Sequence, residues 1–228
     1  MLKHAVRTVL AAYGAVSVLD RAFHDWGATT AERTSALPGD DRVPDVATQS
    51  TMAITINAPA AAVWPWLVQM GCGRAGWYSY DLIDNGGVAS ATRLLAEHQD
   101  IAVGYVIPAD PKNRAGFPVL IVEPERALVL GKVVDSSARR PIEYPGLRGP
   151  MVWSFILAEP VEGMTRLLVR TRAGPQPPLE RVLDPVFGLA HTVMQRRQLR
   201  SIKQRVESRI ARTLTIARRE PLERRAAG

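Results

Sequence analysis

Alternation of apolar and polar positions predicts several short strands. Residues 52–57 alternate with a period of two, as expected for a strand with one buried side. Residues 151–157 and 165–171 show the same period farther along the chain. Three more short apolar segments are predicted as strands, at residues 104–108, 119–123 and 127–132. Strands at this spacing, joined by turns, indicate an antiparallel sheet.

The alternation in two of these strands predicts which side of the sheet is buried. In the last strand Leu167 and Val169 share one face, while Arg166 and Arg170 share the other. We expect the arginine face to be in contact with water, because antiparallel sheets commonly bury only one face. In the strand before it, the residues on the apolar side are Met151, Trp153, Phe155 and Leu157.

Helical patterns separate the strands and end the chain. Residues 60–70 are strongly apolar, and they begin after Asn57-Ala58-Pro59 and end at Gly71, as a capped helix does. Two further short helices are expected, one within residues 73–87 and one at 90–95. From residue 179 onward apolar residues recur at helical spacing and predict one long terminal helix.

This order of elements predicts an α+β architecture. A curved antiparallel sheet would wrap around the long C-terminal helix, and two short helices would close a cavity between them. The predicted contacts across that space join Ile54, Ile56, Trp153 and Phe155 of the sheet to Phe187, Val193 and Met194 of the helix.

The chain divides into four predicted parts. Residues 1–26 form an amphipathic or membrane-surface helix, whose uncharged stretch at 8–19 is too short to cross a bilayer; a cleaved signal or a short anchor is the alternative. Residues 27–49 are polar and rich in turn residues and predict an extended linker. Residues 50–212 form the domain, and residues 213–228 form a basic tail.

Charge and cysteine content narrow the partners. The chain has 228 residues and a formal charge of +7. From residue 196 onward it contains eleven Lys and Arg and three acidic residues. The N-terminal helix and the basic tail predict peripheral contact with an anionic membrane. No nucleic-acid module or interleaved aromatic stripe accompanies the charge, so nucleic acid is not expected. The single cysteine, Cys72, excludes an internal disulfide framework and a cysteine-cluster metal site.

Several motifs resemble a known family. Residues 51–59 (TMAITINAP), 63–71 (VWPWLVQMG) and 76–81 (GWYSYD) resemble the START-like helix-grip superfamily, the SRPBCC group, and within it a bacterial polyketide-cyclase and lipid-transport branch. Shorter stretches fit the same branch: residues 26–29 (WGAT), 37–40 (LPGD), 97–99 (EHQ), 103–104 (VG) and 196–203 (RRQLRSIK). The resemblance covers roughly residues 26–210, and implies a helix-grip fold that carries or senses hydrophobic ligands or, less often, acts as a cyclase.

Two other types of site are not supported by the sequence. Residues 71–76 (GCGRAG) spell a dinucleotide fingerprint, but a helix precedes the glycines where that motif needs a strand. The glycines are therefore interpreted as a helix cap and turn, and no cofactor is expected. A zinc site needs several ligands close together, and none is expected because the histidines, His4, His24, His98 and His191, are scattered.

The candidate site combines aromatic surface with a few polar groups. Tyr80 as acid and Asp81 as base are the pair that a cyclase would use, although Asp81 could instead cap the short helix. The predicted ligand-binding residues are Trp64, Gln69, Arg74, Trp77, Tyr78, Trp153, Phe155 and His191. Trp153 and His191 also have simpler interpretations, as core and as an uninvolved histidine.

These observations lead to one functional hypothesis and one alternative. The chain is predicted to bind or transport a hydrophobic small molecule, lipid-like or polycyclic, in an internal cavity. The alternative is an enzyme of the polyketide cyclase or dehydratase type that uses acid and base residues of the cavity. The expected location is the cytoplasm, with association to a membrane through the N-terminal helix and the basic tail.

Overall fold

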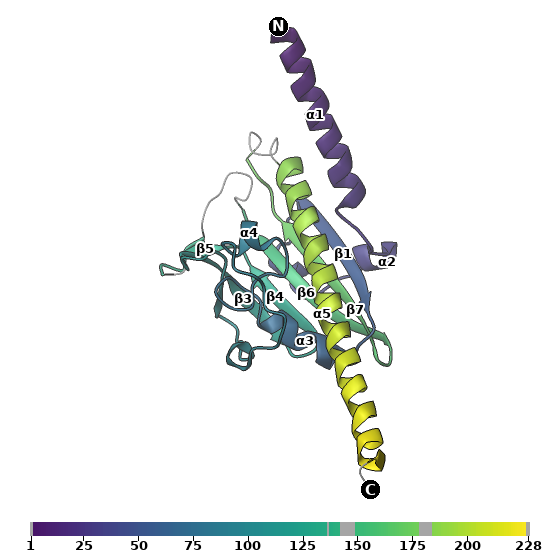
Figure 1. The fold of residues 1–228 in the computed structure, drawn as a ribbon. Coiled ribbons are helices and arrows are strands. Elements are labelled where there is room, and N and C mark those ends of the chain that lie inside the picture. The colour runs from purple at the N-terminus through teal and green to yellow at the C-terminus, as the bar shows by residue number, and fades with distance from the viewer. Residues whose placement is uncertain (1, 136, 142–148, 178–183, 227–228) are drawn as a thin grey trace.

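The computed structural model describes residues 2–135, 137–141, 149–177 and 184–226, and shows an antiparallel sheet beside one long helix (Figure 1). The strands are β1 (Thr48–Ile56), β2 (Val106–Pro108), β3 (Ala115–Glu123), β4 (Ala127–Gly131), β5 (Val134–Asp135), β6 (Met151–Val161) and β7 (Met164–Ala173). Their order across the sheet is β1-β7-β6-β4-β3-β2, with β5 paired to β3. All of these pairs are antiparallel, as the alternating pattern predicted.

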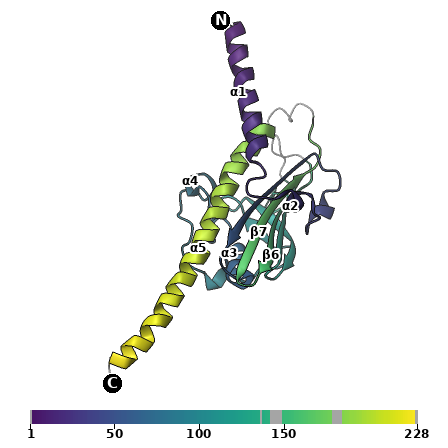
Figure 2. The ribbon, with the colours of Figure 1, turned by 90° about the vertical axis from the view of Figure 1, so that its right-hand side faces the viewer.

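The helices are α1 (Leu2–Phe23), α2 (Thr30–Thr34), α3 (Ala60–Val68), α4 (Asp81–Asp84) and α5 (Asp184–Ala226), with single 3-10 turns at Asp40–Arg42 and Ala96–His98. α5 crosses one face of the sheet, which we call the inner face, and extends well beyond it (Figures 1 and 2). A curved antiparallel sheet against a long C-terminal helix is the helix-grip architecture, and the predicted fold class is confirmed. α5 continues without interruption into the stretch predicted as a separate basic tail.

One of the predicted helices is absent. The segment 90–95 contains no helix, and a 3-10 turn at Ala96–His98 follows it instead. α3 forms as predicted, with Pro65 inside it. Gly71 adopts a φ of +128° just beyond this helix, a conformation that a side chain disfavours, and it forms a bridge with Gly76. The glycine-rich stretch is therefore a tight loop that follows a helix, which does not fit the dinucleotide motif.

The main core lies between the inner face and α5. It combines apolar residues from β1, β6 and β7 with α3 and the middle of α5. Its fully buried members include Met52, Ile56, Val63, Trp66, Leu67, Phe155, Leu167, Leu199 and Ile202. The strand alternation thus predicted correctly which side of β1, β6 and β7 faces the helix.

The predicted helix contacts of this core are wrong in part. Phe187 is 42% exposed and Val193 is 46% exposed, and Met194 is partly buried. The sheet-facing apolar residues come later in α5, at Leu199 and Ile202. The first turns of α5 contact α1 instead, so apolar spacing there does not mark the sheet-facing side.

We call residues 24–46 the covering segment. Its Trp26 packs against the main core and α5, and from Ala28 onward the segment lies on the opposite, outer face of the sheet. The extended linker predicted for residues 27–49 is therefore wrong, because this stretch contains α2 and a 3-10 turn packed on the sheet. Its apolar residues cover small clusters of the outer face: Leu37 packs against the cluster that contains Ile156, and Val43 belongs to the cluster that contains Val129. The arginine side of β7 was predicted to be in contact with water, and this prediction is wrong because the covering segment lies over it.

The buried arginines of β7 explain how a charged face is covered. Arg170 is 1% exposed and pairs with Asp40 at 2.7 Å. It also donates to Thr51 Oγ1 and to the carbonyls of Glu32, Arg33 and Ser35, so its hydrogen-bonding capacity is used. A buried charge is tolerated when it is paired and hydrogen-bonded in this way.

A second ion pair lies nearby on the outer face. Arg166 Nε lies 2.7 Å from Glu32 Oε1, and this hydrogen bond lowers the pKa of Glu32 to about 2. Glu32 also completes a capping box with Thr29, in which each residue accepts the other's backbone N–H.

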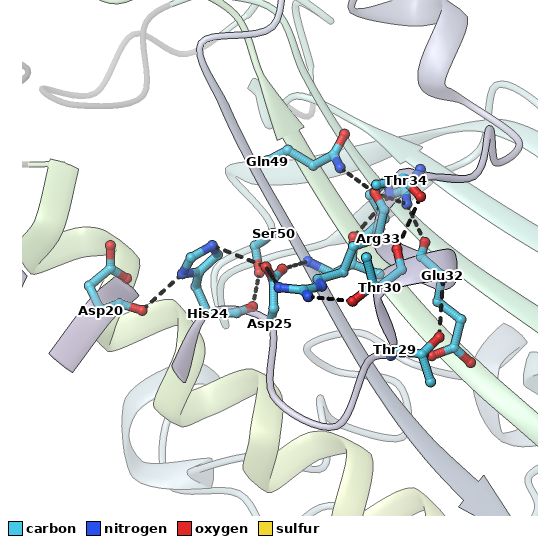
Figure 3. A network of polar contacts seen from close by, with 12 residues as sticks. Asp20, His24, Asp25, Thr29, Thr30, Glu32, Arg33, Thr34, Gln49 and Ser50 are labelled. Carbon is cyan, nitrogen blue, oxygen red and sulfur yellow. Dashed lines mark hydrogen bonds and ion pairs between the residues drawn. The ribbon is translucent and has the colours of Figure 1, made fainter. Parts of the chain in front are cut away.

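The start of the covering segment is held by a polar network (Figure 3). Asp25 accepts a hydrogen bond from the backbone N–H of Thr51 at 2.8 Å and contacts both His24 and Arg33. Ser50 donates to the carbonyl of His24. These contacts fix the covering segment to the edge strand β1.

The motif at residues 37–40 sits against the outer face. Gly39 has a φ of +93°, and a Cβ there would lie 2.7 Å from Val129 Cγ1. Ser154 donates to the carbonyl of Pro38, and Asp40 pairs with Arg170. The residues that carry part of the family resemblance are therefore structural contacts on this face.

α1 projects from the rest of the molecule (Figures 1 and 2). Its end approaches α5 closely, since a Cβ at Gly188 would lie 2.6 Å from Asp20. Beyond it, Trp26 lies under Arg196 and Arg200 of α5, which are 5.0 and 5.3 Å from its ring. In the part of the chain that the structure describes, we find no helix both long and apolar enough to span a bilayer.

Candidate functional site

A cluster of five rings occupies the space between the inner face and α5. β6 contributes Trp153 and Phe155, two residues apart and hence on one side of the strand. Trp77 stacks on Trp153 at 5.5 Å, and Phe117 of β3 meets Trp153 edge-on at 5.5 Å. His191 of α5 closes the cluster, 5.9 Å from the Trp153 ring. We call these five residues the aromatic cluster.

A chain of hydrogen bonds from α5 orients the rings. Trp153 donates its Nε1–H to Gln195 Oε1 at 2.9 Å, and Gln195 donates to Gln198 Oε1 at 2.7 Å. Gln198 in turn donates to the carbonyl of Trp77 at 2.9 Å. Gln195 and Gln198 are 3% and 2% exposed, and His191 lies one helical turn earlier on the same face. The polar residues on this face of α5 therefore hold two tryptophans in place.

His191 is the titratable group of the cluster. Its Nε2 lies 3.1 Å from Thr171 Oγ1 of β7. Burial lowers the pKa of His191 to about 4, because the surrounding protein disfavours the charged ring. At neutral pH the side chain is therefore an uncharged imidazole beside a hydroxyl group.

The rings lie in the space in which the sequence predicted a cavity. Centroid distances of 4.9–5.9 Å leave these rings in contact with one another. Phe155 and Trp77 are buried, but Phe117, Trp153 and His191 each retain some accessible surface. Solvent thus reaches part of an apolar cluster that lies inside the fold.

Three of the predicted ligand-binding residues, Gln69, Tyr78 and Trp64, do not belong to the aromatic cluster. Gln69 is fully buried, donates to Tyr78 Oη at 2.7 Å and accepts from the backbone N–H of Leu95. Tyr78 is 1% exposed, and burial raises the pKa of its hydroxyl. Trp64 packs from α3 onto the core as a partly buried side chain. These residues hold the loop after α3 in place.

Arg74 secures the same loop. It donates to the carbonyls of Val68, Met70 and His98 at 2.8–3.0 Å, and to Tyr105 Oη at 3.0 Å. Its guanidinium also lies 5.1 Å from the Tyr105 ring. With this many partners, the side chain acts as a clamp between segments.

The predicted acid–base pair lies apart from the rings. Asp81 accepts hydrogen bonds from both the backbone N–H and the hydroxyl of Ser90, and it is the first residue of α4 rather than its N-cap, so the capping interpretation is wrong. Tyr80 is 41% exposed, with Arg197 5.7 Å from its ring. The partners of this pair are Ser90 and Arg197 rather than members of the aromatic cluster.

The sequence analysis missed four residues of this site. Phe117 was missed because the strand was expected to start at residue 119, whereas β3 starts at Ala115. Thr171 was assigned to β7 but not to the site. Gln195 and Gln198 interrupt an apolar helical pattern, and with His191 they form a polar stripe at helical spacing. That stripe was the available signal.

No group of three or more His, Cys, Asp or Glu side chains that could hold a metal ion occurs among the described residues.

Of the comparisons with known proteins, the one with solved structures found matches. Neither a protein-family model nor a curated protein matches this chain. Among solved structures, it is similar to protein MLL2253 from Mesorhizobium loti, with 18% identity, a TM-score of 0.44, and coverage of 71% of this chain and 98% of that chain.

Two other similar structures have comparable scores. A protein from Arthrobacter aurescens has 15% identity and a TM-score of 0.44, over 77% of this chain and 92% of that chain. The di-domain ARO/CYC StfQ, from the steffimycin biosynthetic pathway, has 13% identity and a TM-score of 0.43, over 75% of this chain and 54% of that chain. The fold assignment rests on the strand order and α5 described above, which make this chain a helix-grip protein.

Proposed function

We propose that the chain binds an apolar small molecule at the aromatic cluster, between the inner face of the sheet and α5. The observation that carries this proposal is that Phe117, Trp153 and His191 retain accessible surface although they lie inside the fold. Interior rings that solvent reaches offer an apolar ligand both contact area and an entry path. The sequence hypothesis of a hydrophobic ligand is therefore kept, with the site now assigned to these rings.

The ligand is expected to combine a flat apolar body with one polar group. The body would stack on Trp153 and Phe117, displacing water and shifting the rings that now touch. The polar group would reach His191 and Thr171, which can donate and accept hydrogen bonds without carrying charge. A polycyclic or lipid-like molecule with a hydroxyl or carbonyl group fits this description.

The acid–base pair predicted for a cyclase does not belong to the aromatic cluster. Such an enzyme needs an acid and a base beside its substrate. Tyr80 and Asp81 contact Arg197 and Ser90 instead. We therefore propose binding without assigning a reaction.

Binding can be tested with the fluorescent apolar probe 8-anilinonaphthalene-1-sulfonate and the full chain. The Phe117→Trp variant places a larger ring in the partly accessible space, and we expect the probe to bind at least about fivefold more weakly. Tyr80→Phe is the control and should bind as wild type does. Equal affinity in all three proteins would contradict the proposal.

A second measurement does not depend on the filling variant. Probe bound at the cluster should quench both of its tryptophans, Trp77 and Trp153, by energy transfer, so the Trp153→Phe variant should lose more of the quenching than a variant that removes a tryptophan elsewhere. Trp64→Phe removes a tryptophan on α3 and should keep it. If Trp64→Phe, rather than Trp153→Phe, abolishes the quenching, the probe binds elsewhere. Mass spectrometry of an organic extract of the purified chain then identifies any natural ligand.

A further inference from the structure

A polar hollow of about 400 Å³ lies between α5 and the segment that contains α4. Three arginines line it, Arg197, Arg205 and Arg212, together with hydroxyl groups from both walls. Arg197, Arg205 and Arg212 follow the spacing of two helical turns, and Ser201 and Ser208 lie between them, so one face of α5 supplies this wall. Guanidinium and hydroxyl groups together are typical of sites for phosphate.

The three arginines differ in what they already contact. Arg205 donates to the carbonyl of Ala91 at 2.9 Å and lies 4.8 Å from the Tyr78 ring, so it holds the two walls together. Arg197 and Arg212 are exposed at the two ends of the hollow. Their charge is therefore presented to the solvent side of the hollow.

An apolar surface adjoins this hollow. Tyr80, Leu82, Ile83 and Val88 are 41%, 86%, 70% and 67% exposed, all within nine residues around α4. We call these four residues the apolar tip. Arg197 lies 5.7 Å from the Tyr80 ring and joins the tip to the hollow. In Figure 2, α4 projects beyond α5 on the side away from α2, so the tip is presented outward.

The acidic residues of α4 do not oppose an anionic partner from this surface. The carboxylate oxygens of Asp84 are buried, and burial and the neighbouring Asp81 raise the pKa of Asp84. Asp81 is bound to Ser90 within the wall of the hollow. The outward groups are therefore apolar side chains beside basic ones.

We infer that the apolar tip and the arginines of the hollow form a docking surface for an anionic phospholipid membrane. Exposed Leu and Ile side chains would enter the boundary between headgroups and acyl chains, and Arg197 and Arg212 would bind lipid phosphate. This surface differs from the N-terminal helix and basic tail, for which membrane contact stays a prediction. It would place a carrier of apolar molecules at a surface where such molecules are found.

The test is co-sedimentation of the full chain with vesicles of phosphatidylcholine alone or mixed with phosphatidylserine. The Leu82→Ser/Ile83→Ser variant should partition at least about tenfold less onto the mixed vesicles, because two apolar side chains no longer insert. Its control is Val161→Ser, an apolar residue 60% exposed in the β6–β7 turn, which should partition as wild type does.

The charge is tested separately. An arginine near an anionic surface contributes about fivefold to partition, so Arg197→Gln/Arg212→Gln should bind the mixed vesicles about 25-fold more weakly. It should match wild type on phosphatidylcholine alone. The control is Arg114→Gln/Arg126→Gln, whose side chains are 74% and 73% exposed, and it should stay within about twofold of wild type.

Two results would overturn the inference. If both docking variants bind as their controls do, any membrane contact belongs to another part of the chain. If only the arginine variant loses binding, and inorganic phosphate at constant ionic strength displaces wild type from the vesicles, the hollow binds a free anion and the apolar tip does not dock.

Discussion

The two faces of the sheet bury different kinds of side chain. The outer face buries charge: Arg170 and Arg166 are paired with Asp40 and Glu32 beneath the covering segment. The inner face buries rings, which α5 orients through neutral glutamine side chains such as Gln195. Both faces belong to the same strands and differ only by the alternation of side chains along them.

The difference supports a structural role for the outer face and agrees with the ligand-binding role proposed for the inner face. On the outer face Arg170 makes hydrogen bonds with several partners and is 1% exposed, which leaves it no capacity for a ligand. On the inner face Trp153 and Phe117 retain accessible apolar surface. A buried arginine whose donors are all used stabilises one arrangement, whereas a partly accessible apolar cluster can exchange contacts with a ligand.

The largest expected effect is on the outer face. Replacing Arg170 by Met leaves the Asp40 carboxylate without its 2.7 Å partner and removes the donors to three carbonyls. The free energy of unfolding, measured in urea, should fall by about 3–5 kcal/mol. Arg126→Met at an exposed turn is the control and should change it by less than about 0.5 kcal/mol. A loss below about 1 kcal/mol for Arg170→Met would mean that the network is not structural.

The inner face should respond to pH through His191. Its pKa is about 4 in the folded chain and near 6.5 when unfolded, so the unfolded chain binds the proton first as pH falls. Stability is therefore unaffected by this group above pH 6.5 and decreases between about 6.5 and 4, by up to about 3 kcal/mol. His191→Gln should flatten this part of the stability curve. An unchanged slope in the variant would show that His191 is not buried as a neutral ring.

A smaller effect is expected where the rings meet α5. Trp153→Phe removes the Nε1–H donor and leaves Gln195 Oε1 unpaired in the interior. The free energy of unfolding should fall by about 1–3 kcal/mol. In Gln195→Leu, which also ends the chain of hydrogen bonds, the loss should not add to that of Trp153→Phe. Full additivity in the double variant would show that the two side chains are not coupled.

The smallest effect is predicted for Tyr80, which lies on neither face. Its ring is partly exposed beside Arg197, and Tyr80→Phe should change the free energy of unfolding by less than about 0.5 kcal/mol. Probe binding at the aromatic cluster should be unchanged. Loss of probe binding in this variant would bring Tyr80 back into the site and revive the cyclase hypothesis.

Local pattern was enough to predict most of the fold. Alternation in β1, β6 and β7 predicted which side chains face α5, because a strand places successive residues on opposite faces. Apolar helical spacing predicted α5, but not that Phe187 lies in the first turns, which contact α1, or that Val193 lies on the side of α5 away from the sheet. The apolar period of a helix identifies its apolar side. It does not show how much of the helix packs against the sheet.

The site was predicted less completely. Trp77, Trp153, Phe155 and His191 do come together, as expected for rings that face one space. Asp81 and Tyr80 follow Trp77 closely in sequence but turn toward Ser90 and Arg197. Tyr78 has a φ of +59°, and this change in chain direction is not visible in residue type.

By itself the sequence determined the strand and helix order and the apolar side of each strand, since these follow from periods of two and 3.6 residues. Only the tertiary structure decided that the arginine side of β7 is buried. Asp40, which pairs with Arg170, is 130 residues away along the chain. A charged residue on a strand is therefore exposed or buried according to partners that local pattern does not contain, because burial depends on charge pairing in space.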